Sequence, residues 1–413
     1  MHEINTNRRM TLHIFNPEHD IALAANLSNF TAPHAGRQLR NDLGFLPALW
    51  AQEGDRVLVQ HEESALKAYR RVCHRLVKLG IKKIENGELR MENYDMFKGG
   101  NGSGCGNHNS QLSTLIATPH SDRGSENSQF IRPWGWDRAI RRELERNGVP
   151  VSLLPTAEQI EQIRQLSHRR TSAQLLPLLQ MEGTVGEAFE CTTIEQVEEL
   201  HRRYGRLVLK APWSSSGRGV RFCDAARLNN KEKIINNNDA QMAWVTNILK
   251  AQGSIMAEPY YNKVKDFGME FEADAEGHIR YLGLSLFHTV NGAYEGNILA
   301  TESVKREMIS RYIPISLLDS VKQRIVERLN LDGYVGPFGI DMMIVKSIGN
   351  GNHNCQLSIV NSQLLLHPCV EINLRRTMGH VALNISPTDD DIRAVMRVIY
   401  DGNHYKLKIN KLR

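Results

Sequence analysis

The sequence predicts an α/β protein built from more than one domain. Strand-like and helix-like segments alternate over the first 80 residues, which is the pattern of a layered α/β sheet. The 413 residues correspond to two or three domains at about 150 residues each. Because the chain reads as one continuous α/β unit from about residue 155 onward, we predict two domains, 1–154 and 155–413.

The first domain opens with a strand expected at Thr11–Phe15, followed by the segment Asn16–Asp20 and a helix-like run, IALAANL. A second strand, Asp55–Gln60, precedes a helix that ends at Gly80. Since open α/β sheets bind ligands where strands end, the side chains of Asn16–Asp20 could contact a substrate. The interpretation we favour is a turn in which Asp20 caps the next helix.

Two low-complexity tracts interrupt this pattern, at about 95–128 and about 348–363. They share near-identical octads, GNHNSQLS and GNHNCQLS. Their histidines and the cysteine of the second octad could be metal ligands. An octad that occurs only twice is no solenoid period, however, so we interpret both tracts as surface insertions.

Composition excludes several classes of protein. No apolar run approaches the ~18–20 residues of a membrane span, and the first ten residues lack the apolar segment of a secretory signal. The six cysteines show no C-x-x-C spacing, which favours reduced thiols in a cytoplasm. A formal net charge of +5 is too small to indicate the concentrated basic surface that a nucleic-acid-binding protein needs. We expect a cytoplasmic protein with no membrane or nucleic-acid partner, and the sequence does not indicate its oligomeric state.

A phosphate-binding loop is predicted between two short strands in the second domain. Arg206–Lys210 reads as a strand that ends in a lysine, and the loop Ser214–Gly219 leads to a second strand, Val220–Phe222. Small residues let backbone N–H groups approach phosphate oxygens closely, and the lysine can supply a point charge. The spacing matches neither a P-loop nor G-x-G-x-x-G, so the loop alone could equally be a plain turn.

Oxygen-bearing side chains gather on two apolar strands further along. Asp341 lies in the first, Ile340–Val345, and Glu371 and Asn373 lie in the second, Cys369–Asn373. Glu371 and Asn373 are two residues apart and therefore share one sheet face. If the strands pair as a hairpin beside Asp341, three hard oxygen ligands converge, which suits Mg²⁺ bound to ATP phosphates.

The order of these elements resembles the ATP-grasp superfamily of carboxylate ligases over about 155–400. The shared features are the strand lysine with its small-residue loop, a hinge strand ending in Glu258, a helix with a Gly-rich turn, and the final Glu-x-Asn-x-Arg. Removing the tract 348–363 brings the separation of Asp341 and Glu371 down to that of an ordinary hairpin. The resemblance implies a Rossmann-like pre-ATP-grasp domain and then a two-lobed ATP-grasp unit, with the smaller lobe at about 206–262.

The resemblance also implies roles for the matching residues. Lys210 and Arg375 are the candidate catalytic residues: the lysine contacts the α- and β-phosphates, and the arginine steadies an oxyanion. The candidate nucleotide contacts are Lys210, Ser214, Ser215, Ser216, Gly217, Gly219, Met256, Glu258, Tyr260 and Asp266, and the candidate metal ligands are Asp341, Glu371 and Asn373. Where the family places a second phosphate-binding lysine, this chain has Arg169 and Arg170, which either replace it or belong to a solvated helix face.

The function that follows is an ATP- and Mg²⁺-dependent ligase. It would activate a substrate carboxylate as an acyl phosphate for attack by an amine. Two alternatives remain open: a phosphotransferase on the same scaffold and a non-catalytic nucleotide-binding regulatory protein. The sequence identifies neither the acid nor the acceptor, and fold analogy cannot supply them.

Overall fold

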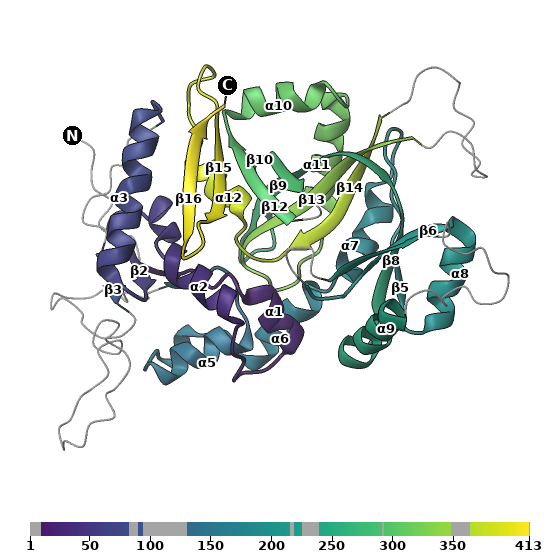
Figure 1. The fold of residues 1–413 in the computed structure, drawn as a ribbon, viewed down its shortest axis with the longest axis horizontal. Coiled ribbons are helices and arrows are strands. Elements are labelled where there is room, and N and C mark those ends of the chain that lie inside the picture. Colours follow the sequence, from purple (N-terminus) through teal and green to yellow (C-terminus); the bar gives the residue numbers. More distant parts are fainter. Residues whose placement is uncertain are drawn as a thin grey trace. The chain divides into compact units, whose positions relative to one another are not determined.

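The computed structural model describes residues 10–81, 90–93, 130–214, 219–224, 239–290, 293–347 and 364–412. Both predicted insertions lie outside these residues, as do Ser215, Ser216 and Gly217 of the predicted phosphate loop. The chain forms two compact units: unit 1 is Met1–Ile163 with Asn384–Arg413, and unit 2 is Arg164–Leu383 (Figure 1). Among the described residues, no helix is long and apolar enough to span a membrane.

Unit 1 contains a four-stranded parallel sheet in the order β3-β2-β1-β4. The apolar side chains of β1, β2 and β4 form one core with those of α5, centred on Ile14, Leu58 and Leu144. The order places β1 between β2 and β4, so the carboxyl ends of β1 and β4 meet at the point where the strand order reverses. The sheet and its helices are β1 (Thr11–Ile14), α1 (His19–Ala25), α2 (His34–Leu43), a 3-10 helix (Leu46–Leu49), β2 (Arg56–Val59), α3 (Glu62–Lys78), β3 (Arg90–Asn93), β4 (Phe130–Pro133) and α5 (Arg138–Arg146).

The C-terminal segment of the chain belongs to unit 1. It forms an antiparallel hairpin of β15 (Ala394–Tyr400) and β16 (Tyr405–Lys411), and β16 packs beside α2 and α3. The sequence predicts a division at residue 154 and one domain from there to the end of the chain. The compact units instead divide at residue 163, and 384–413 joins the first unit. The boundary region contains a 3-10 helix, Val151–Leu153, which is followed by α6 (Ala157–Leu166).

The first sheet of unit 2 has the order β5-β8-β6-β7, with antiparallel neighbours. Its core joins Leu207, Leu209, Ile255 and Val245. The β6–β7 pairing runs from Arg206↔Asp224 to Lys210↔Val220, which is the hairpin predicted around the phosphate loop. The elements are β5 (Phe189–Cys191), α8 (Ile194–Tyr204), β6 (Arg206–Lys210), β7 (Val220–Asp224), α9 (Asp239–Gln252) and β8 (Ile255–Pro259), so the lobe predicted at 206–262 also includes β5 and α8.

The second sheet of unit 2 is antiparallel throughout, in the order β10-β9-β13-β14. One of its faces is sealed by apolar side chains, among which Phe267, Phe271, Phe338 and Ile340 are 0% exposed. The remaining elements are α7 (Arg170–Leu175), a 3-10 helix (Leu176–Leu179), β9 (Asn262–Ala273), β10 (Ile279–Ser285), β11 (Phe287–Val290), β12 (Ala293–Leu299), α10 (Glu302–Ser310), α11 (Ile315–Arg328), β13 (Gly336–Lys346), β14 (Leu364–Asn373) and α12 (Met378–Asn384). The mixed α/β class predicted from the sequence is confirmed.

Candidate functional site

The predicted oxygen-bearing side chains lie together on the second face of the β9-β13-β14 sheet. The antiparallel register sets Asp341 directly opposite Glu371, and two residues further along Gly339 lies opposite Asn373. Because alternate residues of a strand share a face, Asp341, Glu371 and Asn373 all project from the same side. The hairpin inferred from the sequence is therefore confirmed, and the three side chains do converge.

A third carboxylate, which sequence reasoning missed, belongs to the same face. Glu270 lies opposite Gly339 on the neighbouring strand β9, and it is 4% exposed. A Cβ added at Gly339 would lie 2.6 Å from Glu270 Oε2, so the glycine leaves the space that this carboxylate occupies. The signal in the sequence is the alternation of DFGMEFE, which places Glu270 on the strand face opposite to that of Phe267 and Phe271.

Negative charge is concentrated around Asp341. Burial, together with the nearby charges of Glu371 and Glu270, raises the pKa of its carboxyl to about 8, although the charge of Arg375 opposes the rise. Asn373 Nδ2 donates a hydrogen bond of 3.2 Å to Asp341 Oδ2, and Arg375 donates one of 3.1 Å to Asn373 Oδ1. The arginine thus lies beside the carboxylates, and its role at an oxyanion stays a prediction.

Arg169 resolves the question of whether the His168–Arg170 segment is solvated. Its guanidinium donates a hydrogen bond to Ser214 Oγ and another to Glu371 Oε1, both at 2.7 Å, and its side chain is only 6% exposed. Arg170 is 40% exposed and pairs with Glu190. A solvated face is therefore wrong for Arg169, which connects the start of the predicted phosphate loop to the Glu371 carboxylate on β14.

Lys210 and Glu258 form a buried ion pair in the first sheet. Their charged atoms are 2.6 Å apart, and the side chains are 9% and 7% exposed. The register places Lys210 opposite Met256 and Val208 opposite Glu258, which makes the lysine and the glutamate diagonal neighbours on one face. The structure therefore brings two predicted site residues together, and they form an ion pair with each other.

A buried histidine adjoins Lys210, and sequence reasoning missed it. His367 on β14 is 1% exposed, and neither of its ring nitrogens has a hydrogen-bond partner among the described residues. Burial, reinforced by the positive charge of Lys210, lowers the pKa of its imidazole to about 3, so the ring is neutral. The edge of the Tyr261 ring lies against it, with centroids 5.4 Å apart. No periodicity marked this position, because a lone histidine in an apolar strand has no distinctive spacing.

The predicted nucleotide-binding residues Met256, Tyr260 and Asp266 are buried or make contacts within the protein. Met256 is 1% exposed within β8. The backbone N–H of Tyr260 donates to the carbonyl oxygen of Arg206 at 3.0 Å, and the Arg206 guanidinium lies 3.8 Å from the centre of the tyrosine ring. Asp266 accepts a hydrogen bond of 2.6 Å from Lys263. The nucleotide contacts assigned to Met256, Tyr260 and Asp266 stay predictions.

The ends of the predicted phosphate loop meet closely. The backbone N–H of Ala211 donates to Gly219 O at 2.8 Å. A Cβ at Gly219 would lie 2.3 Å from Ser214 Oγ, so only glycine fits against that serine without a shift. This Ser214 hydroxyl is the group that accepts a hydrogen bond from Arg169.

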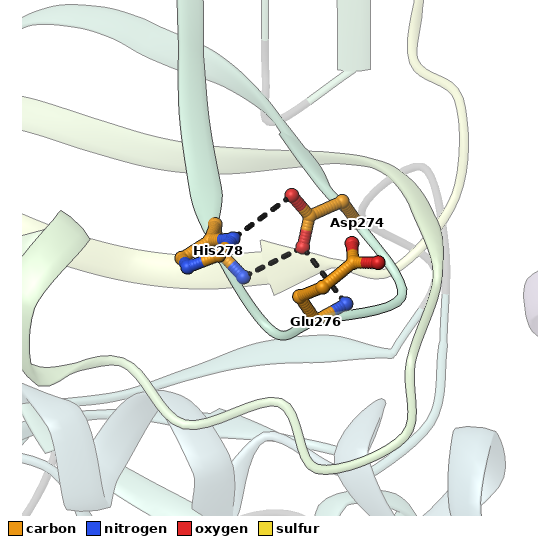
Figure 2. A group of neighbouring side chains, drawn as sticks. All are labelled: Asp274, Glu276 and His278. Carbon is orange, nitrogen blue, oxygen red and sulfur yellow. Dashed lines mark hydrogen bonds and ion pairs between the residues drawn. The ribbon is translucent and has the colours of Figure 1, made fainter.

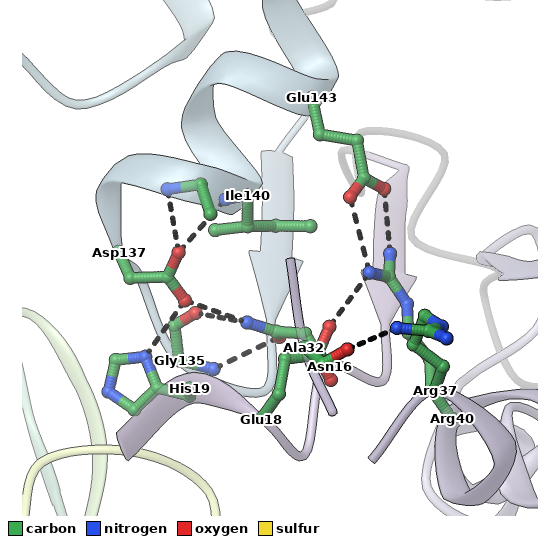
Figure 3. Close-up of polar contacts among 11 residues, drawn as sticks. Asn16, Glu18, His19, Ala32, Arg37, Arg40, Gly135, Asp137, Ile140 and Glu143 are labelled. Atoms are coloured by element: carbon green, nitrogen blue, oxygen red, sulfur yellow. Dashed lines mark hydrogen bonds and ion pairs between the residues drawn. The ribbon is translucent and has the colours of Figure 1, made fainter. Parts of the chain in front are cut away.

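The segment Asn16–Asp20 takes part in a buried network of unit 1 (Figure 3). Asn16 Nδ2 donates to Gly135 O at 2.9 Å and to Asp137 Oδ2 at 3.3 Å, and His19 Nδ1 lies 3.3 Å from the same carboxylate. Asp137 caps α5 through its other oxygen. These contacts join the loop after β1 to the loop after β4, which is a structural role.

The predicted cap of the next helix is wrong in its detail. Helix α1 begins at His19 with Glu18 at the N-cap position and no side-chain cap, so Asp20 lies inside the first turn. Figure 3 shows Glu18 turned toward Arg40, whose guanidinium also pairs with Glu143. Burial raises the pKa of Glu18, and the charge of Arg40 opposes that rise.

A different cluster has the spacing of a metal site but the structure of a turn. Asp274, Glu276 and His278 are the one group of three such side chains, within the described ranges, whose ligand atoms all lie within 4.8 Å. All three are exposed, and Asp274 accepts from the backbone N–H groups of Glu276 and His278 (Figure 2). These hydrogen bonds close the turn between β9 and β10, so the cluster carries no metal assignment.

Comparisons with known proteins give matches only among solved structures. No family model and no curated protein matches the chain. An ADP complex of N5-carboxyaminoimidazole synthetase from Staphylococcus aureus matches with a TM-score of 0.44 and 12% identity, over 95% of this chain and 83% of that one. The biotin carboxylase domain of Hydrogenobacter thermophilus 2-oxoglutarate carboxylase, with MgADP, ADP and bicarbonate, matches with a TM-score of 0.42 and 13% identity, over 95% and 75%. A biotin carboxylase from Campylobacter jejuni matches with a TM-score of 0.40 and 12% identity, over 95% and 76%.

Proposed function

We propose that unit 2 is an ATP-grasp unit and that the protein is an ATP- and Mg²⁺-dependent ligase, which joins a carboxylate to an amine and releases ADP and phosphate. The observation that carries the proposal is the register of β13 and β14, which sets Asp341 opposite Glu371. Arg169 adds a second support, because it connects that carboxylate face to Ser214 at the start of the candidate phosphate loop.

The donor set on this face fits a magnesium ion. Mg²⁺ prefers hard oxygen ligands, typically one or two carboxylates together with phosphate oxygens. Asp341 and Glu371 supply the carboxylates and Asn373 supplies an amide oxygen. When bound by these residues, Mg²⁺ would offset the charge of the ATP phosphates.

The protein's own residues would act through charge and position. Lys210, released from Glu258, would lie against the α- and β-phosphates, and Arg169 would lie near the loop that covers them. A substrate carboxylate oxygen attacks the γ-phosphorus, the bond to the β–γ bridging oxygen breaks, and ADP leaves. The amine nitrogen then attacks the acyl carbon of the acyl phosphate, phosphate departs and the amine loses a proton. Arg375 would stabilise the oxyanion of that second step.

The proposed compartment is the cytoplasm, where cysteine thiols stay reduced. Cys73, Cys191, Cys223 and Cys369, the cysteines that the structure describes, are all free. Free thiols are the ordinary state of cysteine in a reducing compartment, which supports this part of the proposal.

The proposal is tested by ADP release against pooled carboxylic acids and amines, with and without Mg²⁺, followed by mass analysis of products. We expect Glu371→Ala and Asp341→Asn to reduce ADP release more than 100-fold, because each removes a carboxyl group from the candidate metal site. Glu276→Gln, in the exposed turn of Figure 2, is the matched acidic control and should retain full activity.

Three outcomes would contradict it. Near-normal turnover by Glu371→Ala would exclude the metal assignment. A phosphorylated product without an amide bond would identify a phosphotransferase. Nucleotide binding without ADP formation over the whole screen would identify a non-catalytic binding protein.

A further inference from the structure

A cavity in unit 1 has a lining that is strongly biased toward positive charge. It has a volume of about 680 Å³ and lies among the C-terminal end of α2, helix α3 and strand β16. Helix α3 and strand β16 are also neighbours in Figure 1. Five lysine and arginine side chains line it, against a single carboxylate; the five are Lys67, Arg71, Arg75, Lys406 and Lys408. A pocket of this volume accommodates a ligand of metabolite size.

The cations come from two regular elements that face one another. Lys67, Arg71 and Arg75 are spaced four residues apart, so they follow one side of α3 with a rise of about 6 Å between them. Lys406 and Lys408 are alternate residues of β16 and share one side of that strand. Two rows of positive charge therefore line opposite walls of the cavity.

The hydrogen bonds that Arg75 and Asp42 form with other lining residues do not neutralise these cations. Arg75 Nε donates to the carbonyl oxygen of Ile409 at 2.8 Å, which fixes α3 to the edge of β16. Asp42, the one lining carboxylate, accepts from the backbone N–H of Tyr405 at 2.8 Å and lies 2.9 Å from His404 Nδ1. The Asp42 carboxylate therefore interacts with the turn between β15 and β16.

Four of the five cations form no ion pair with a carboxylate among the described residues. Lys406 pairs with Asp401, whereas the other four, Lys67, Arg71, Arg75 and Lys408, have no such partner in the part of the chain that the structure describes. Like charges gathered around a concave surface raise the local concentration of anions and favour an anionic ligand over water alone. The lining also includes two apolar side chains, Phe45 and Leu43, which are each 1% exposed.

We infer that this groove binds a small molecule that carries two or more phosphate or carboxylate groups. The inference stands apart from the nucleotide chemistry proposed for unit 2, because every residue of the groove belongs to unit 1. Phosphate and carboxylate share the required chemistry, so the test uses tripolyphosphate and citrate as separate probes.

The test is the rate of lysine acylation in the full-length protein, measured by mass spectrometry with each probe and with sodium chloride at equal ionic strength. We expect one probe or both to slow labelling of Lys67 and Lys408 at least fivefold. Lys78, on α3 but outside the cavity, should react at an unchanged rate. Stronger protection by tripolyphosphate would indicate a phosphate ligand, and stronger protection by citrate would indicate a carboxylate ligand.

A matched pair of variants separates a built site from general attraction. The triple variant K67Q/R71Q/K408Q should bind the protecting probe at least tenfold more weakly, and K78Q should bind it as the unaltered protein does. The inference is overturned if protection is no greater than that given by sodium chloride, if Lys78 is protected equally, or if only residues of unit 2 are protected. It is also overturned if the triple variant is folded by circular dichroism and still binds normally.

Discussion

The carboxylate face of unit 2 and the cationic groove of unit 1 both gather charges of one sign, but they do so by different means. On the face, Asp341, Glu371 and Glu270 are fixed by the register of three paired strands, and Asp341 is buried enough for its pKa to rise to about 8. In the groove, Lys67 and Lys408 are surface side chains held by helix and strand periodicity. Charge fixed by a sheet interior is strong and position-dependent, whereas charge on a surface is weak and easily screened.

The largest expected effect concerns the buried pair of Lys210 and Glu258. Lys210→Met and Glu258→Leu should each lower the free energy of unfolding by about 3–5 kcal/mol, because each leaves a buried charge without its partner. The double variant should lose much less than the sum of the two. Hydrogen exchange of peptides covering β6 and β8 measures this.

An exposed pair is the matched control for that cycle. Arg311 and Glu307 lie 3.1 Å apart on α10 and its end, with side chains 64% and 58% exposed. Removing either should change the free energy of unfolding by less than about 1 kcal/mol. Equal changes in the free energy of unfolding at the two pairs would contradict the distinction between buried and surface charge.

A smaller effect is expected from His168, whose ring is buried beside Arg169 and Arg170. Burial and the charges of Arg170, Arg164 and Arg169 lower the pKa of its imidazole to about 3, against an ordinary value of 6.5 when unfolded. The unfolded chain therefore binds a proton that the folded chain does not, and stability falls as the pH falls from 6.5 toward 3. The free energy of unfolding therefore falls between pH 7 and pH 4, and His168→Asn should make that fall smaller by about 2–3 kcal/mol.

Urea unfolding at several pH values measures this dependence. A His168→Asn profile that is superimposable on that of the unaltered protein would contradict the assignment of a neutral, buried imidazole.

The smallest effect is expected in the cationic groove. The variant K67Q/R71Q/K408Q should raise Tm by about 1 °C at low salt, because it relieves repulsion among exposed like charges. The gain should vanish in 1 M sodium chloride, where the Debye length is about 3 Å. A fall in Tm at low salt would show that these cations make stabilising contacts.

Much of the candidate site followed from local pattern. The strand ending at Lys210 and the hairpin of Asp341 and Glu371 were predictable because strand periodicity fixes which residues share a face. Glu270 and His367 were missed because strand alternation does not show what lies beside a polar residue, and only the pairing of β9 and β14 with β13 shows which neighbours each one has. Arg169 was undecided for a related reason: its partners, Ser214 and Glu371, lie 45 and 202 residues away.

The sequence by itself determined the α/β class, the order of the strands that carry Lys210, Asp341, Glu371 and Asn373, and the direction in which alternate side chains point. These depend on local periodicity, which the order of residues contains directly. The tertiary structure decided which charges meet: Lys210 with Glu258, Arg169 with Glu371, and α3 with β16 from the far end of the chain. Such contacts depend on burial and on pairings between distant segments, and their energies are set by surroundings that no short stretch of sequence specifies.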